Sequence, residues 1–453
     1  MKAHQFFWIV PALLAPAIGW SACQQDVVLY GQVSAVERQH SLWRIQQKNP
    51  YRADNMLRDA ALNYAGSCQP AADLTVDFSL YGLFWSGWRP TGAFEQDDSH
   101  ARFLADKLAL TYAASDQLRL ELGKLKAQGG LFYLKSPAAL MNNYYAGFRS
   151  SRIYYPGVQP AYTASYWGGG ITHDNEVRSL SLSVSPALSR EGPYYQSSGN
   201  WRDAARSNSD ERYLLSWSGR EVADHTPTLN LMGGSNKSVA VADSYQFAPQ
   251  WQFNAEAAWH WQQQWRHLDA QLADRLQGYS FPDQLYSREE QRNTELALGV
   301  QYTTDQFSQF GVEYYFQSAG YSVAEWRKQT DLIRFLNQRS GNAALDRLFD
   351  DYKFLMAGEI NNTTNRGQLL GKHYLSTFNS ILMADESVIQ PYAIFNLGDY
   401  STLVGVNYSK PVAAFDKKLA IYCGVYSAQG KQNSEFGLFG DTIGSWLGFK
   451  YQF

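Results

Sequence analysis

The chain has 453 residues, of which 45% are apolar, 18% charged and 15% aromatic, and its formal net charge is −3. This charge argues against a nucleic-acid partner, and the length suits either two soluble domains or one large barrel. The mean hydropathy of −0.40 is that of a soluble protein, but strands that alternate between lipid and a wet interior escape such an average. The 30 Tyr and 14 Trp residues fit the aromatic girdles found at membrane interfaces.

The first residues have the pattern of a secretory signal peptide. Lys2 supplies a positive charge, an apolar stretch runs from Phe6 to Ile18, and small residues follow up to Ala22. No later segment offers about 18 consecutive apolar residues, so no transmembrane helix is expected. We therefore predict that residues 1–22 are a signal peptide, which leaves the periplasm, the medium or the outer membrane as destinations.

Many later segments alternate apolar and polar residues with a period of two, as β-strands with two different faces do. Most are close to the 9–11 residues that a tilted transmembrane strand needs. The predicted strands are 27–36, 56–67, 74–85, 102–113, 117–125, 161–170, 177–186, 211–219, 227–234, 238–247, 250–262, 293–303, 308–318, 369–382, 387–397, 401–409, 417–427 and 443–453. The predicted fold is all-β: a transmembrane antiparallel β-barrel of about 18 strands that occupies residues 23–453.

The clearest alternation lies in the stretch WQFNAEAAWHWQ, which starts at Trp251. Trp251, Phe253 and Trp259 share one face, and Glu256 and His260 share the other. A soluble sandwich keeps its sequestered face dry. Polar residues along the inner face therefore indicate a wet interior, and the apolar face is expected to meet lipid.

The last strand ends in the stretch GSWLGFKYQF. Leu447, Phe449, Tyr451 and Phe453 alternate with polar residues and glycine. A terminal Phe after alternating apolar positions resembles the sorting signal of bacterial outer-membrane barrels. This pattern predicts that the strand is sealed to the first strand, and that the outer-membrane barrel assembly machinery is a partner.

The connections between the predicted strands fall into two alternating classes. The short class comprises 68–73, 114–116, 171–176, 220–226, 248–249, 304–307, 383–386 and 410–416. The long class includes 86–101, 126–160, 187–210, 263–292 and 319–368. Short periplasmic turns and long outer loops are how outer-membrane barrels are built. Because the first two strands alternate poorly, a 16-strand barrel behind a periplasmic or plugging segment 23–73 stays an alternative.

Two long loops carry helical stripes. Leu268, Leu272 and Leu276 recur every four residues, and segment 323–357 has the pattern of two helices, the second capped by Asn342. These helices are expected to cover the barrel mouth from outside. The alternative is that they plug it.

Three cysteines remain in an exported chain, where an oxidising compartment favours disulfides. Cys23 precedes the first predicted strand and Cys68 follows the second, at the same end of two antiparallel neighbours. We therefore predict a Cys23–Cys68 disulfide. In the alternative, WSAC is a lipoprotein box in which Cys23 is lipidated. Cys423 is expected to be a small buried apolar residue.

Charged and polar side chains on the inward parity are the candidate pore-lining residues. Both signs are about equally represented, so no strong ion selectivity is expected. Any one of them could also be an ordinary hydrated wall residue. The candidates are Asp77, Lys107, Arg119, Glu121, Arg212, Glu256, His260, Glu295, Glu313, Lys418 and Lys450. Inward aromatic residues add flat apolar surface that suits sugar rings or the packing of loop helices. They are Tyr81, Tyr315, Tyr392, Tyr422, Tyr426 and Trp446.

Residues 118–142 resemble the strand and loop of alginate-export-type monomeric barrels. In that family a Gly-Arg/Lys pair precedes Trp-Gly and then Asn-Pro; here the Trp is absent and Ser136 stands before the proline. The matching residues are Gly123, Lys124, Gly129, Gly130, Pro137 and Asn142. The resemblance implies an 18-stranded monomeric channel whose loop 126–160 folds toward the lumen, and it does not establish alginate as cargo.

Evidence for catalysis or metal binding is sparse. HExxH, CxxC and GxSxG are absent, and the eight histidines lack metal-ligand spacing. His373 with Ser376 or Ser380 is the one faint candidate for an outer-membrane lipase. We predict no enzyme activity, no cofactor and no metal.

The sequence therefore predicts a porin-like, monomeric channel in a bacterial outer membrane. Its partners would be outer-membrane lipid and a cargo of small polar solutes or oligosaccharides. The alternative is a non-conducting barrel whose outer loops act in surface binding, as a receptor or in polysaccharide assembly. Cargo, direction of transport and gating do not follow from the sequence.

Overall fold

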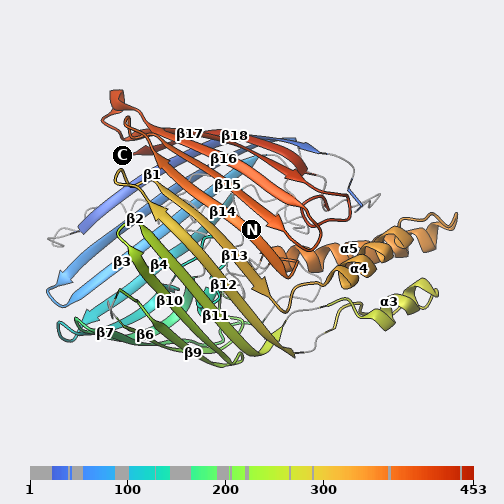
Figure 1. Cartoon of the computed structure of the whole chain (residues 1–453), viewed down its shortest axis with the longest axis horizontal. Helices are drawn as coiled ribbons and strands as arrows, with labels where there is room; N and C mark the ends of the chain where they lie inside the picture. Colours follow the sequence, from blue (N-terminus) through green and yellow to red (C-terminus); the bar gives the residue numbers. More distant parts are fainter. Residues whose placement is uncertain are drawn as a thin grey trace, which may run out of the picture.

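The computed structural model describes residues 23–38, 41–42, 55–86, 101–127, 129–142, 165–190, 204, 207–219, 224–264, 267–287, 290–365, 369–438 and 441–453. The predicted signal peptide, residues 1–22, lies outside these ranges. The strands of the described part form a barrel, and its helices extend beyond one end of it (Figure 1).

Eighteen antiparallel strands form one closed sheet in which neighbours in sequence pair and β1 also pairs with β18 (Figure 1). The strands are β1 (Cys23–Arg38), β2 (Met56–Ala71), β3 (Leu74–Ser86), β4 (Ala101–Ala113), β5 (Leu118–Lys126), β6 (Ser165–Asp174), β7 (Arg178–Ser185), β8 (Arg212–Gly219), β9 (Thr228–Gly234), β10 (Ser238–Ala248), β11 (Trp251–Gln264), β12 (Glu290–Thr303), β13 (Gln309–Gln317), β14 (His373–Leu382), β15 (Val388–Asn396), β16 (Thr402–Pro411), β17 (Leu419–Gln429) and β18 (Asp441–Gln452). The 18-strand prediction is confirmed. The 16-strand alternative is wrong, because β1 and β2 belong to the wall.

The first and last strands close the ring. Tyr30 lies opposite Lys450 in the register of β1 and β18. The amide of Phe453 donates a hydrogen bond to the carbonyl of Val27 at 3.0 Å. Closure leaves no unpaired sheet edge, and only closed barrels and helices satisfy all backbone polar groups within lipid.

Alternation along each strand divides the wall into an apolar outer face and a more polar inner face. Trp251, Trp259 and Leu447 are 42%, 47% and 61% exposed, whereas Glu256 and His260 on the opposite parity are 2% and 3% exposed. Exposed large apolar side chains of this kind are stable where the surrounding medium is lipid. The outer face is therefore the lipid-facing surface.

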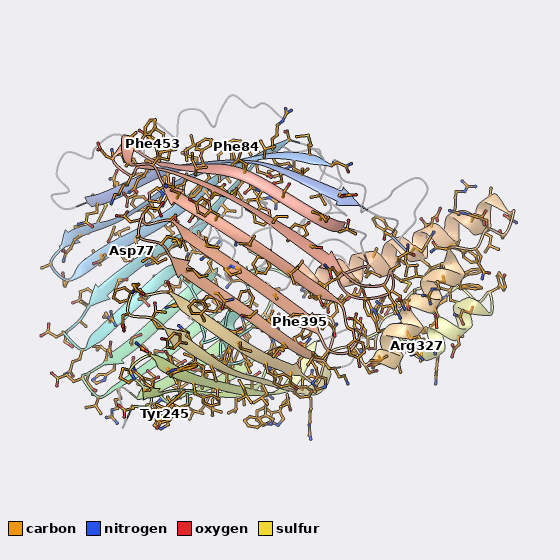
Figure 2. All side chains as sticks on the ribbon, turned by 45° about the horizontal axis from the view of Figure 1, so that its top comes forward. Asp77, Phe84, Tyr245, Arg327, Phe395 and Phe453 are labelled. Atoms are coloured by element: carbon orange, nitrogen blue, oxygen red, sulfur yellow. A yellow bond between two sulfur atoms is a disulfide. The ribbon has the colours of Figure 1, made fainter. Side chains whose placement is uncertain are left out.

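Aromatic side chains form a girdle where β10 to β13 meet their short turns. The centroids of successive rings are 6.2, 6.2, 4.8 and 6.5 Å apart. The rings are those of Tyr245, Phe247, Trp251, Tyr302 and Phe310. Figure 2 shows Tyr245 and Phe453 at the end of the barrel opposite Arg327 on the helices. Aromatic belts mark a membrane–water interface. Outer-membrane barrels have their short turns on the periplasmic side, so the short-turn end is the periplasmic end.

Cys23 and Cys68 form a disulfide between β1 and β2. The two residues are register partners, and their Cα atoms are 4.1 Å apart. The bridge lies at the periplasmic end and ties the start of β1 to the wall. Cys423 on β17 is a free thiol and only partly buried.

Within the described residues, three α-helices lie in the outer loops and match the predicted helical stripes. They are α3 (Ala270–Gln277), α4 (Val323–Leu336) and α5 (Ala343–Asn365), in addition to the short 3-10 helices η1 (Leu140–Asn142) and η4 (Ala413–Phe415). Side-chain caps fix where the α-helices begin. Asp269 caps α3, and Ser322 forms a capping box with Glu325 in α4. Asn342 accepts from the amide of Ala344 at 2.9 Å at the start of α5.

The helices share a core of their own. Leu276 of α3, Leu332 and Ile333 of α4, and Phe349 and Met356 of α5 are all at most 2% exposed and belong to one cluster. None of the described helices combines the length and the apolar composition needed to cross a membrane. They extend outward from the barrel end rather than into it (Figure 1), so the plug alternative is wrong for these helices. We call α3 to α5 the outer helical module.

Hydrogen bonds join the outer helical module to loops from other parts of the wall. The indole nitrogen of Trp326 donates to the carbonyl of Asn433 at 2.6 Å, and the side chain of Asn337 donates to the carbonyl of Leu42 at 2.8 Å. Leu42 follows β1, and Asn433 lies between β17 and β18. The outer loops near the closure seam are therefore linked to one another.

Glu435 fastens the loop between β17 and β18 to the rim of the barrel. Its carboxylate accepts hydrogen bonds from the Tyr374 hydroxyl at 2.6 Å, the Asn396 amide at 2.7 Å and the Leu370 backbone at 3.0 Å. Its own backbone amide donates to the Asp399 carboxylate at 2.6 Å. Burial raises the pKa of Glu435 to about 7, and the neighbouring Asp399 charge adds to this.

The attachment of the β17–β18 loop to the barrel rim is expected to be more stable in acid than in alkali. The pKa of Glu435 is about 7 when the loop is closed, against an ordinary value of 4.5. The closed loop therefore binds more protons between these values, and its stability falls as pH rises through that window. Amide exchange of residues 431–438, corrected for intrinsic rates, should show more opening at high pH. Glu435→Gln, a mimic of the protonated acid, should remove the pH dependence, and a dependence that survives it would contradict this assignment.

Candidate functional site: the inner loop

The segment that follows β5 is bound to the inner face of a distant part of the wall. Residues 129–142, which we call the inner loop, contact inward side chains of β8 and β9 and of β11 to β13. None of these strands is a neighbour of β5; they follow it by three to eight positions in the ring. The inner loop therefore occupies part of the lumen. The resemblance had implied that loop 126–160 folds toward the lumen; residues 129–142 do so, and residues 143–160 lie outside the described part of the chain.

Glu256 on β11 holds both ends of a turn in the inner loop. Its carboxylate accepts from the backbone of Leu131 at 2.7 Å, the backbone of Ala138 at 2.8 Å and the hydroxyl of Ser136 at 2.8 Å. Gly130 lies so close to Ser136 that a Cβ at residue 130 would overlap the Ser136 side chain. Hydrogen bonds to a charged group contribute about 1.5–3 kcal/mol each, so this carboxylate is the main anchor of the loop.

Glu313 on β13 provides a second anchor. Its two carboxylate oxygens accept from the backbone amides of Tyr133 and Leu134, both at 3.0 Å. Glu313 is 7% exposed and Glu256 is 2% exposed. A buried carboxylate is tolerated when donors satisfy its oxygens. Here the loop backbone supplies those donors, so the two acids fix the path of the loop.

Apolar contacts fill the space beneath the inner loop. Ala138, Leu140 and Met141 are buried in a cluster whose wall residues are mostly alanine or other aliphatic side chains. Alanine at inward positions leaves room for a loop that larger residues would exclude. The wall residues of this cluster on β8 to β11 are Leu214, Met232, Ala240, Ala242 and Ala258. Nearby, Gly299 on β12 makes room for the ring of Phe132.

Further polar contacts complete the attachment. Arg212 on β8 donates to the carbonyl of Met141 at 3.0 Å, and Asn230 on β9 donates to the carbonyl of Ala138 at 2.8 Å. Lys135 of the loop lies 4.0 Å from Glu295 on β12. Carbonyl groups of the inner loop thus accept hydrogen bonds from wall side chains, its amides donate to wall carboxylates, and its one cation, Lys135, lies near a wall carboxylate.

The structure brings five of the eleven predicted pore-lining residues together beneath the inner loop. His260 meets Ser238 at 2.7 Å and lies 3.7 Å from Glu295. Each of the five residues is at most 7% exposed, so they are buried and do not face an open water-filled lumen. They are Arg212, Glu256, His260, Glu295 and Glu313. The sequence analysis proposed all five as pore-lining residues and did not foresee that four of them, all except His260, contact a loop.

The other predicted pore-lining residues lie away from the inner loop. Asp77 and Lys107 form an ion pair at 2.8 Å, and Arg119 pairs with Asp174 at 3.2 Å. Lys418 does not fit the prediction, because it is an exposed residue of the turn that precedes β17. The remaining two, which are partly buried, are Glu121 and Lys450.

Aromatic rings lie flat on the inner wall of β15 to β18. Tyr392, Tyr426 and Trp446 each cover a glycine on a neighbouring strand, so close that a Cβ at the glycine would overlap the ring. The glycines are Gly405, Gly444 and Gly424. A ring that packs over a strand glycine fills the space where that residue has no side chain. Here one face of each ring lies against the wall.

The described residues bear on the predicted absence of a metal site and on the faint lipase candidate. Among them, no three His, Cys, Asp or Glu side chains gather in a way that could hold a metal ion. His373 is exposed and bonds to the hydroxyl of Tyr314 at 2.8 Å, whereas Ser376 is 1% exposed and lies on the inward parity. His373 and Ser376 therefore lie on opposite faces and do not form the predicted pair.

No protein-family model matches the chain, and no curated protein matches it. Solved structures do match. OccK8 (OprE) of Pseudomonas aeruginosa has 11% identity and a TM-score of 0.51, with 95% of this chain and 98% of that chain covered. OccAB1 of Acinetobacter baumannii has 8% identity and a TM-score of 0.54, with 97% and 98% covered. OccAB3 of the same organism has 10% identity and a TM-score of 0.51, with 95% and 99% covered.

These similarities concern the fold. The chain has the closed 18-strand architecture of an outer-membrane barrel, over almost the full length of each structure compared. The predicted resemblance holds at the level of such a barrel. Its narrower form, the alginate-export type, finds no support in these structures.

Proposed function

We propose that this protein is a channel that passes small polar solutes, including oligosaccharides, across the bacterial outer membrane. The inner loop carries the proposal, because it is fixed inside a closed barrel by carboxylates on β11 and β13. An anchored loop that fills part of the lumen makes the passage narrower, and because the loop is fixed to the wall it is not a flexible lid that closes the passage. Polar walls, ion pairs and flat rings along the remaining inner face suit hydrated solutes.

The proposal includes several features of the mature chain. Residues 1–22 act as a signal peptide, and the Cys23–Cys68 bridge forms after export. Exposed apolar side chains occur on β1 to β15, β17 and β18, which suits a barrel surrounded by lipid, and the proposed state is a monomer. The terminal strand offers the alternating pattern that the barrel assembly machinery would recognise. Selection by wall and loop requires no catalytic group.

Single-channel recording in planar bilayers tests the proposal. Pure protein should insert and give discrete conductance steps in simple salt, with weak preference between cations and anions because both signs line the wall. Protein unfolded by heat before reconstitution is the control and should give none. Correctly folded protein that inserts but never opens would refute channel function.

The outer helical module favours a second candidate function, surface binding. Tyr279 and Phe281 beside α3 are 58% and 40% exposed, at an end of the molecule that lies outside the membrane. A variant that lacks residues 319–368 separates the two functions, because it removes the rings of Phe335 and Phe349 that pack against Tyr279. A channel should keep or gain conductance, whereas a surface binder should lose its ligand while its barrel stays folded.

A further inference from the structure

Three aromatic rings form a stack that connects the inner loop to the wall. The Tyr133 ring lies 5.7 Å from the Phe378 ring at 29°, and the Phe378 ring lies 6.3 Å from the Tyr392 ring at 10°. Tyr133 belongs to the loop, Phe378 to β14 and Tyr392 to β15. We call these three rings the lumen stack.

The lumen stack is held in place from both ends. The backbone amide of Tyr133 donates to Glu313 at 3.0 Å, while its side chain is 65% exposed. The Tyr392 ring packs directly over Gly405, so the strand backbone supports one of its faces. A preorganised ring loses little conformational freedom when a ligand binds to it. The stack is therefore suited to contact a passing solute.

The charged groups around the lumen stack are already engaged. Glu313 accepts from two loop amides, and Lys135 faces Glu295. Uncharged amides adjoin the stack instead, since Gln390 and Asn407 are register partners next to the pair of Tyr392 and Gly405. Amide side chains both donate and accept hydrogen bonds. This combination suits a neutral solute better than a charged one.

A pyranose ring has the complementary chemistry. Its C–H groups form an apolar face that packs on an aromatic ring, and its hydroxyl groups at the edge bond to amides. Sites for small ligands commonly combine such flat apolar surface with a few polar groups. Resting on the proposed channel function, we infer that the lumen stack of Tyr133, Phe378 and Tyr392 is a binding subsite for the sugar rings of neutral oligosaccharides.

The test is block of ionic current by a neutral glucose oligomer, with maltohexaose as the probe. Wild-type channels in planar bilayers should show concentration-dependent, saturable block. Tyr133→Ala should weaken the apparent affinity by about 3- to 10-fold, the range expected for loss of one stacked ring. Tyr133→Phe, which keeps the ring, should stay close to wild type.

Phe310→Leu is the matched control, because it removes an aromatic ring from the lipid-facing side of the same barrel. It should leave the block unchanged. Channels that conduct but are not blocked by maltohexaose would overturn the subsite and leave the channel proposal intact. Equal block in wild type and Tyr133→Ala, or equal weakening in Phe310→Leu, would also overturn it. A protein that never conducts would overturn both proposals.

Discussion

Replacing Glu256 and Glu313 together by alanine should raise single-channel conductance and leave the barrel folded. The two carboxylates accept five hydrogen bonds from the inner loop. Each is expected to contribute about 1.5–3 kcal/mol, and each unsatisfied loop donor would prefer water to an apolar wall. The loop should therefore detach from β11 and β13, which widens the passage. Single-channel amplitude in planar bilayers measures this change.

A second readout reports on the loop itself and does not depend on conduction. Lys135 has a side chain that is 7% exposed and lies against Glu295. Trypsin should cleave after Lys135 in the double variant and spare this site in the wild type. Glu121→Gln is the matched control, because Glu121 lies on β5, opposite Thr111 and Gly170, and not on one of the strands that anchor the inner loop. Unchanged conductance together with a protected Lys135 would show that the anchors are not needed.

The strands were predictable because the residue pattern of each strand reflects the surroundings of its two faces. Lipid on one side and a polar interior on the other impose a period of two, as Trp251 and Glu256 illustrate within one strand. The helices of the outer loops were predictable for a similar reason, since Leu272 and Leu276 recur at helical spacing. In both cases the information lies within a few consecutive residues.

The inner loop could not be located in this way. Glu256 and Leu131 are 125 positions apart, and Glu313 and Tyr133 are 180 apart. No local period connects such partners, so the acids were interpreted as hydrated wall residues. The available signal was indirect: alanines interrupt the polar inward parity at Ala258 and in the neighbouring strand β10.

Gly168→Ala should prevent normal assembly of the barrel, although it adds a single methyl group. A Cβ at Gly168 would overlap the carbonyl oxygen of Val184 on β7. Its register partner on β5 is Gly123, which has a φ of +129° and would place a Cβ on the carbonyl of Leu108. Four neighbouring strands, β4 to β7, therefore pass too closely for a side chain at either glycine. The substitution should cost about 3 kcal/mol or more, because neither neighbouring backbone can move without breaking its ladder.

Gly170→Ala is a stringent comparison, because it places the same methyl group two residues along the same strand. A Cβ there would be 3.5 Å from the carbonyl oxygen of Leu182, which is an ordinary contact. It should change stability by roughly 0.5 kcal/mol or less. The folded fraction, followed by heat-modifiable gel mobility in detergent, should fall sharply for Gly168→Ala and stay near wild type for Gly170→Ala. Equal folded fractions for the two variants would mean that β5 to β7 can separate locally. In that case β5 would not be rigid enough to hold the inner loop that follows it in a fixed position.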